Sequence, residues 1–292
     1  MESKINYESA IKNIRSELKT YLVDSNLKSV VLGVSGGIDS TLCALLAQPV
    51  CHDLNIPLIG RSLPSSSNSE GENTRAMVIG DLFCDNFKEV NISRQTDSLI
   101  HLVDEPYHNQ DESWRLYAEE RAIQNGNVKA RVRMIYLYDL ASINQGVVLS
   151  TDNWTEYLLG FWTLHGDVGD YGMVQSLWKT EVYEMSDWIV KNELTSDFVK
   201  EAVQEVINAD ATDGLGISKS DMDQIMPGWK GSSRAGYAEV DKILMKAVDL
   251  VKFPKSLAKR YPESHPVIDR HLRTEFKRHN PLNISRENII NK

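Results

Sequence analysis

Apolar residues recur at two different spacings along the chain, and the alternation between these spacings predicts the fold. Short apolar runs bounded by turn residues are typical of buried strands, and four such runs occur, at 29–34, 55–63, 87–92 and 146–152. Apolar residues three and four positions apart predict helices, at 7–23, 39–47, 72–83, 96–103, 127–143, 154–164 and 179–191. Residues 104–126 are polar and predict irregular structure, and the glycine-rich residues 166–172 predict a turn.

Helices that alternate with short buried strands predict an α/β fold built on a doubly wound parallel sheet. Beyond residue 193 the pattern is mostly helical and contains no further strand. No segment has the length and composition of a linker. We therefore expect a single domain over residues 1–292, with an α/β core at 1–192 and a mostly helical C-terminal extension at 193–292.

The sequence VVLGVSGGIDST, residues 30–41, combines a buried strand, a glycine turn and the start of a helix. This order is typical of loops that bind phosphates, because glycines allow close approach and the first N–H groups of a helix attract anions. The lysine of a GxxxxGK[ST] loop is missing, and Asp39 stands near its place. A carboxylate repels phosphates unless a divalent cation lies between them, so the pattern indicates a site for a magnesium–pyrophosphate group. The alternative is a glycine turn in which Asp39 only caps the helix.

Charge and composition narrow the class of protein. With a net charge of −9, the chain lacks the basic surface that bulk nucleic-acid binding requires. No apolar run approaches the roughly 20 residues of a membrane span, and the polar N-terminus does not resemble a signal peptide. The three cysteines, at 43, 51 and 84, form no CxxC pair and predict reduced thiols in a cytoplasmic protein.

The SGGIDS sequence at 35–40 resembles the signature of the ATP pyrophosphatases, which split ATP between its α- and β-phosphates. Further stretches resemble the NAD synthetase family within that group. They follow in the family's order: SLPSSSNSEGENTRAM at 62–77, GNVKARVRM at 126–134, VVLSTDNWTEYLLGFWTLHGDVGD at 147–170, SLWKTEVYEMSDWI at 176–189, LGISKSDMDQI at 215–225 and RTEFKRHNP at 273–281.

The resemblance implies an adenine nucleotide alpha-hydrolase-like, Rossmann-like fold and an amidation that consumes ATP. The carboxylate of nicotinic acid adenine dinucleotide (deamido-NAD) attacks the α-phosphorus of ATP, and pyrophosphate leaves into the glycine loop. Ammonia then displaces AMP from the adenylate and gives NAD. Such chemistry depends on positioning and charge neutralisation more than on a protein nucleophile. Mg²⁺ is the implied cofactor, and the implied assembly is a homodimer.

The resemblance also implies roles for individual residues. Asp39 and Glu156 match the family's metal ligands, Lys179 matches a phosphate-binding lysine, and Asp167 matches the acid proposed to hold ammonium. The ATP-binding positions are Gly33, Val34, Ser35, Gly36, Gly37, Ile38, Asp39, Ser40, Thr151 and Lys179. The positions matching contacts to the dinucleotide are Arg131, Leu164, His165, Asp170, Phe276 and Lys277.

This chain departs from the family's pattern at several of these positions. Leu164 replaces a lysine, His165 replaces an aromatic residue, and Phe276 replaces the histidine of a His-Lys pair. A shortened segment near 208–212 leaves the family's adenine-side threonine unplaced. Too few residues precede the glycine loop for a glutaminase domain, so the implied donor is free ammonia or ammonia from another protein.

Two other functions remain open from the sequence. One is a different amide- or thiol-forming ATP pyrophosphatase, against which the GNVKAR and TDxxE stretches speak. The other is a degenerate homologue that binds adenine nucleotides without turnover, which the changes at Leu164 and Phe276 allow. Retention of Asp39, Glu156 and Lys179 together argues against a binder, because a binder has less need of two metal-binding acids.

Overall fold

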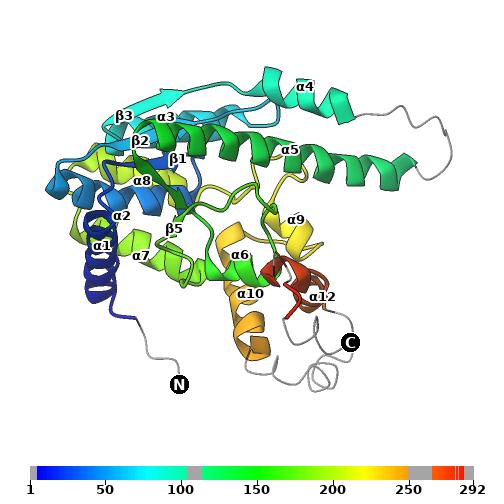
Figure 1. The fold of residues 1–292 in the computed structure, drawn as a ribbon. Helices are drawn as coiled ribbons and strands as arrows, with labels where there is room; N and C mark the ends of the chain where they lie inside the picture. The colour runs from blue at the N-terminus through cyan, green and yellow to red at the C-terminus, as the bar shows by residue number, and fades with distance from the viewer. Residues whose placement is uncertain (1–4, 104–113, 249–264, 280, 282, 286–292) are drawn as a thin grey trace.

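The fold is a five-stranded parallel sheet with helices on both faces, as the sequence predicted (Figure 1). The computed structural model describes residues 5–103, 114–248, 265–279, 281 and 283–285. The strands are β1 (Ser29–Gly33), β2 (Leu58–Ser62), β3 (Asn86–Glu89), β4 (Gly146–Ser150) and β5 (Tyr171–Gly172). Their order in the sheet is β3-β2-β1-β4-β5, so the chain reverses its direction of winding between β1 and β4. Ligands in such folds bind at this reversal, beyond the carboxyl ends of the strands.

The side chains of β1 alternate between two packed layers. Val31 faces α5 (Trp114–Ile143), where it packs with Val132 and Leu137. Val30 and Leu32 face the opposite layer, which contains α1 (Tyr7–Asp24), α2 (Ile38–Leu54), α3 (Glu70–Phe83), α7 (Lys179–Asn192) and α8 (Asp197–Asn208). Because both faces of the strand are covered, it consists of a nearly continuous apolar run.

The remaining helices gather near the carboxyl edge of the sheet (Figure 1). They are α6 (Trp154–Leu159), α9 (Asp221–Ile225), α10 (Ser233–Val248), α12 (Pro266–Arg273) and the 3₁₀ helix η1 (Glu275–His279). α4 (Ser93–Val103) lies beside α5. Buried side chains form one cluster from Ile11 in α1 to Ile268 in α12, so the C-terminal helices share the core of the sheet. The described residues beyond 193 contain helices and no strand.

Two sequence predictions about the elements were wrong. α5 begins at Trp114, so residues 114–126 are helical rather than irregular, while 104–113 lie outside the described residues. Over its 30 residues this helix has no dominant apolar face, so its periodicity gives only a weak signal. The segment 166–172 is not only a turn, because Tyr171 and Gly172 pair with β4 as a two-residue edge strand.

Helix ends account for the other differences. α2 runs through Pro49 to Leu54 because its apolar face continues at Val50 and Cys51, and it stops where Asn55 adopts a left-handed conformation with φ of 53°. α6 ends at Leu159 instead of residue 164 because Gly160, with φ of 57°, caps it. Among the described residues, no helix is both long and apolar enough to cross a membrane.

Candidate active site

The loop between β1 and α2 forms one wall of the site. Gly36 has φ of 78°, and a Cβ atom there would lie 2.4 Å from the carbonyl oxygen of Glu72. Only glycine fits this close approach of the loop to α3. Ser35 and Ser40 fix the loop, since their hydroxyls lie 3.0 Å apart and Ser40 also accepts from the Ser35 N–H at 3.2 Å. No side chain caps the start of α2 at Gly37, so its first N–H groups remain available to an anion.

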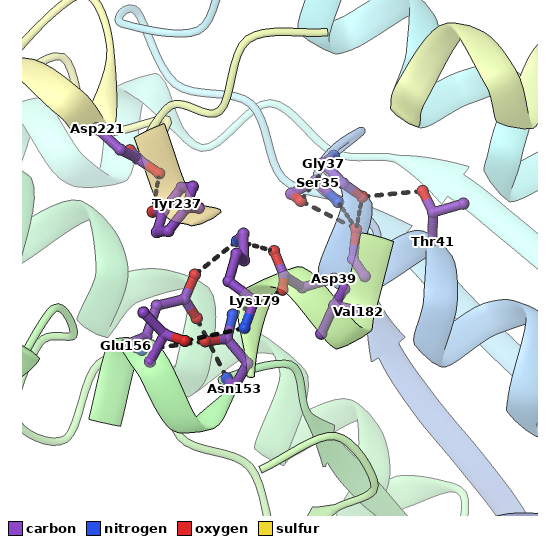
Figure 2. A network of polar contacts seen from close by, with 12 residues as sticks. Ser35, Gly37, Asp39, Thr41, Asn153, Glu156, Lys179, Val182, Asp221 and Tyr237 are labelled. Atoms are coloured by element: carbon purple, nitrogen blue, oxygen red, sulfur yellow. Dashed lines mark hydrogen bonds and ion pairs between the residues drawn. The ribbon is translucent and has the colours of Figure 1, made fainter. Parts of the chain in front are cut away.

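A buried lysine joins the two acids that were predicted to bind metal. The Nζ of Lys179 lies 2.6 Å from Oδ2 of Asp39 and 2.8 Å from Oε1 of Glu156 (Figure 2). The amide of Asn153 donates to the other oxygen of Asp39 at 2.8 Å. Lys179 is 2% exposed, so its charge is neutralised by these carboxylates and not by water.

Three elements bring these side chains together. Asp39 lies in the first turn of α2, beyond β1, and Glu156 lies in the first turn of α6, beyond β4. Glu156 also accepts from the N–H of Asn153, in a capping box that fixes its side chain. Lys179 is the first residue of α7, and its N–H donates to the hydroxyl of Thr155 at 2.9 Å. The reversal of the sheet between β1 and β4 therefore places both acids against one lysine.

The electrostatics of this group follow from burial and pairing. Burial lowers the pKa of Lys179, but Asp39 and Glu156 outweigh it and hold the pKa well above its usual range. Burial raises the pKa of Glu156 to about 7, although Lys179 opposes this rise. Burial, followed by the charge of Asp167, raises the pKa of Asp152 well above its usual range. The site thus holds several acids whose ionised forms require a cation nearby.

These groups line one large cavity of about 630 Å³, which is a suitable size for a nucleotide. Its wall includes the loop at 33–40, Thr151, Asp152, Glu156, Asp167 and Lys179. α5 contributes Arg133, and the C-terminal helices contribute Arg270, Arg273, Phe276 and Lys277. Thr212 also lines the cavity and donates to Glu72, so a threonine from the segment left unplaced by the sequence does reach the site.

Asp167 lies at a second position in the cavity wall. Its Oδ1 accepts from the N–H of Thr163 at 2.8 Å. Burial raises its pKa to about 7, although this hydrogen bond and the charges of Lys277, Arg133 and Arg131 oppose the rise. A carboxyl group with a pKa near neutrality can both bind a cation and accept a proton.

Four of the residues predicted to contact the dinucleotide lie outside the lining of this cavity: Arg131, Leu164, His165 and Asp170. The guanidinium of Arg131 donates through Nε to the carbonyl oxygen of Leu164 at 3.2 Å, so these two are neighbours. Asp170 accepts from the N–H of Val148 at 3.1 Å. Lys277 reaches the cavity, but its Nζ donates to the carbonyl oxygens of Gly160 and Trp162. Phe276 is 63% exposed at the cavity wall.

The sequence analysis missed several residues of the site. Asp152 and Asn153 lie within the TDNWTE stretch that carries Glu156, and Asp221 lies within the LGISKSDMDQI stretch, so their positions in those stretches were available signals. Tyr237 gave no such signal, because its role depends on contacts with residues far away in the sequence.

The two acids fit a magnesium ion. Oxygens of Asp39 and Glu156 already converge on one cationic nitrogen, so they can be reached by a single cation. Mg²⁺ usually takes one or two carboxylates and completes its shell with water and phosphate oxygens. The described residues contain no group of three or more acids, histidines or cysteines suited to a metal.

Comparison with known proteins agrees with this arrangement. The family model of NAD synthase matches residues 10–281. The NH₃-dependent NAD⁺ synthetase of Thermoplasma acidophilum is 28% identical over 282 residues, which cover 96% of this chain and 99% of that protein. The enzyme of the same name from Thermococcus kodakarensis is 30% identical over 252 residues, covering 86% of this chain and 85% of that one.

Solved structures show the same fold. The NMN synthetase of Francisella tularensis superposes with a TM-score of 0.70 at 20% identity, covering 97% of this chain and 99% of that chain. The NH₃-dependent NAD synthetase of Campylobacter jejuni superposes with a TM-score of 0.64 at 20% identity, covering 97% and 100% of the two chains.

Proposed function

Because the chain belongs to the NAD synthase family, we propose that it amidates nicotinic acid adenine dinucleotide with ammonia, consuming ATP and releasing AMP and pyrophosphate. The observation that carries this proposal is the contact of Lys179 with Asp39 and Glu156, beside a glycine loop at the reversal of the sheet.

The loop at 33–40 and the start of α2 bind the β- and γ-phosphates, which leave as pyrophosphate. Asp39 and Glu156 would hold Mg²⁺, which would supply positive charge to neutralise the phosphates. Lys179 supplies a second positive charge to the phosphates as negative charge moves onto the leaving group. Thr151 and Thr212 line the part of the cavity left for the nucleoside.

The ammonia step is assigned to Asp167. Its carboxylate holds ammonium by charge and accepts a proton from it, so that neutral ammonia is released next to the adenylate. Ammonia then attacks the carbonyl carbon of the adenylate, the bond to the AMP oxygen breaks, and an amide forms. Asp152 is a second buried acid of this wall; burial and the charge of Asp167 raise its pKa, so a cation in the cavity would favour its ionised form.

The acid nucleotide is expected to reach the cavity from the outer surface near Arg131, Leu164, His165 and Asp170. We propose that a second copy of the chain covers this surface. In a single copy of the chain, α4 and α5 leave large apolar side chains exposed to water, which is typical of an interaction surface. These side chains are Leu99, Leu102, Ile123, Ile135, Tyr138 and Ile143. A homodimer by light scattering, converted to monomers by Ile135→Glu, is the expected result. A wild-type monomer with full activity would contradict this assembly.

A smaller substrate, nicotinic acid mononucleotide, is a second candidate for the same chemistry. The observation that favours it is the loss of two polar positions that the resemblance assigns to the dinucleotide, at Leu164 and Phe276, the latter being 63% exposed. The amidation is identical in the two substrates, and only the adenylyl half differs.

The deciding experiment measures AMP and pyrophosphate from ATP in the presence of ammonium, with the dinucleotide, with the mononucleotide, or with neither. We expect AMP and pyrophosphate in equal amounts with the dinucleotide and little release without an acceptor. Preference for the mononucleotide selects the second candidate, and ADP with phosphate as products contradicts both. A location in the cytoplasm stays a prediction from the sequence.

A further inference from the structure

Two buried polar side chains from the C-terminal helices interact with Lys179, one through its ring and one through its charge, and have no part in the roles given above. Tyr237, on α10, is fully buried, and Nζ of Lys179 lies 4.9 Å from the centroid of its ring. The hydroxyl of Tyr237 donates to Oδ2 of Asp221 at 2.6 Å (Figure 2). Asp221 is the first residue of α9 and is 3% exposed.

The second oxygen of Asp221 has no hydrogen-bond partner among the described residues, although it is buried. Leaving a buried acceptor unpaired costs free energy, so such groups need a reason in a native structure. Asp221 lines the same cavity as Lys179, and the two charges act on each other, since each shifts the pKa of the other. Asp221 thus offers an anionic oxygen to a cation in the cavity.

Lys179 and a divalent cation compete for the same oxygens. Nζ of Lys179 bridges Asp39 and Glu156, which are also the two acids that fit Mg²⁺. Both cations cannot occupy this position, because like charges at contact distance repel strongly in a buried site. The ammonium of lysine is carried on a flexible four-carbon stem, so it can move to another anion while its backbone stays fixed in α7.

We propose that Asp221 is a positioning residue that receives the ammonium of Lys179 when Mg²⁺ takes Asp39 and Glu156. Tyr237 serves this movement in two ways: its hydroxyl fixes the carboxylate of Asp221, and its ring faces the ammonium with favourable cation–π geometry. The lysine then keeps an anionic partner on the cavity wall, from which it can reach the phosphates of ATP. This inference rests on the proposed magnesium–ATP site.

The first test is metal binding without nucleotide, measured with Mn²⁺ as the probe through loss of the free-ion electron paramagnetic resonance signal. Lys179→Gln removes the competing cation and should tighten Mn²⁺ binding by about tenfold or more, although it removes a residue that catalysis needs. Unchanged or weaker binding in this variant overturns the proposal. If circular dichroism shows that Lys179→Gln is not folded, Lys179→Met is tested in its place, because methionine keeps an unbranched apolar side chain over the ring of Tyr237.

The second test asks whether Asp221 acts through the lysine. Asp221→Asn should weaken Mn²⁺ binding by roughly fivefold in the wild-type background, and Tyr237→Phe, which keeps the ring, by roughly two- to threefold. In the Lys179→Gln background, neither change should affect Mn²⁺ binding further, because there is no ammonium for Asp221 to bind. Asp187→Asn is the matched control on α7, where the carboxylate pairs at the surface with Arg234 at 2.6 Å, and it should leave Mn²⁺ binding unchanged.

The outcomes separate the alternatives. An equal effect of Asp221→Asn with and without the lysine means that Asp221 acts on the metal directly through its charge, and the proposal fails. A loss of thermal stability without any change in Mn²⁺ binding means a structural role only, and the proposal fails as well. The function itself is tested independently by the release of AMP and pyrophosphate from the wild-type enzyme.

Discussion

Replacing Asp167 by asparagine should make the protein more stable while it removes the ammonia step. Asp167 is buried, and its pKa rises from 3.8 to about 7 on folding. A carboxyl group with a raised pKa binds protons more tightly in the folded state, so its ionisation opposes folding. This cost is absent below the unfolded pKa of 3.8, grows as the pH rises, and is complete above about 7.

The size of the effect follows from the shift. A rise of roughly three units corresponds to about 4 kcal/mol at full ionisation. Asparagine keeps the acceptor for the N–H of Thr163 and carries no charge, so Asp167→Asn avoids this cost. The charge of Asp167 also helps to raise the pKa of Asp152. Its removal makes the ionisation of Asp152 less costly, which further stabilises the variant.

The assay is urea unfolding at pH 6 and pH 8.5, which both lie above the isoelectric point of about 5.3. The variant should be more stable than the wild type at both values, with a difference about 1–2 kcal/mol larger at pH 8.5. The control is Asp187→Asn, which removes a carboxylate that is 38% exposed and should therefore not stabilise the protein. A difference that does not grow with pH, or a variant less stable at pH 8.5, would refute the reasoning.

The ratio kcat/KM of Asp167→Asn for ammonium should fall by about 10²-fold or more.

Three further predictions concern the metal site, the glycine loop and the substrate. Asp39→Asn and Glu156→Gln should each lower the rate of adenylate formation by about 10²-fold or more at saturating ATP and Mg²⁺ while the far-ultraviolet circular dichroism stays native; near-normal turnover would contradict their roles. Gly36→Ala should destabilise the protein by at least about 1–3 kcal/mol in thermal unfolding. Alanine is strained at the φ of 78° that Gly36 adopts, and its Cβ atom would lie 2.4 Å from the carbonyl oxygen of Glu72. Gly228→Ala is its control, since φ is 88° but nothing lies within 4 Å, and an equal loss at both positions would show that the clash does not matter. Leu164→Lys should lower KM for the dinucleotide at pH 8 by roughly ten- to a hundredfold and leave KM for ATP unchanged, and a KM that stays the same or rises would mean that this position does not face the substrate.

The sequence was informative where function depends on local order. The strand, the glycine turn and the following helix each have a signature within a few residues, so this local structure and the place of Asp39 in the first turn of the helix could be predicted directly. The same holds for Glu156 in its capping box beyond β4. Parallel strands bring their carboxyl ends to one edge, which is why two loops more than a hundred residues apart could be expected to meet.

Features that depend on long-range packing could not be predicted from the sequence. Over its 30 residues α5 has no dominant apolar face, so its periodicity marks it only weakly as a helix. β5 is only two residues long and exists because β4 offers it a free edge. Tyr237 belongs to an ordinary amphipathic helix, and only the packing of α10 against α7 shows that its ring faces Lys179.

The position of Tyr237 and Asp241 on α10 has a consequence for synthesis of the chain on the ribosome. Asp241 accepts from the N–H of Thr180 at 2.8 Å and from the hydroxyl of Thr155 at 2.5 Å, so α10 holds both the first turn of α7 and the first turn of α6. A nascent chain that has exposed only residues 1–192 already contains Asp39, Glu156 and Lys179, but it has neither the ring beneath the ammonium nor the carboxylate that joins the two helices. Domains generally fold as units, so the contacts that fix the first turns of α6 and α7 can form only once residues 233–248 have been synthesised.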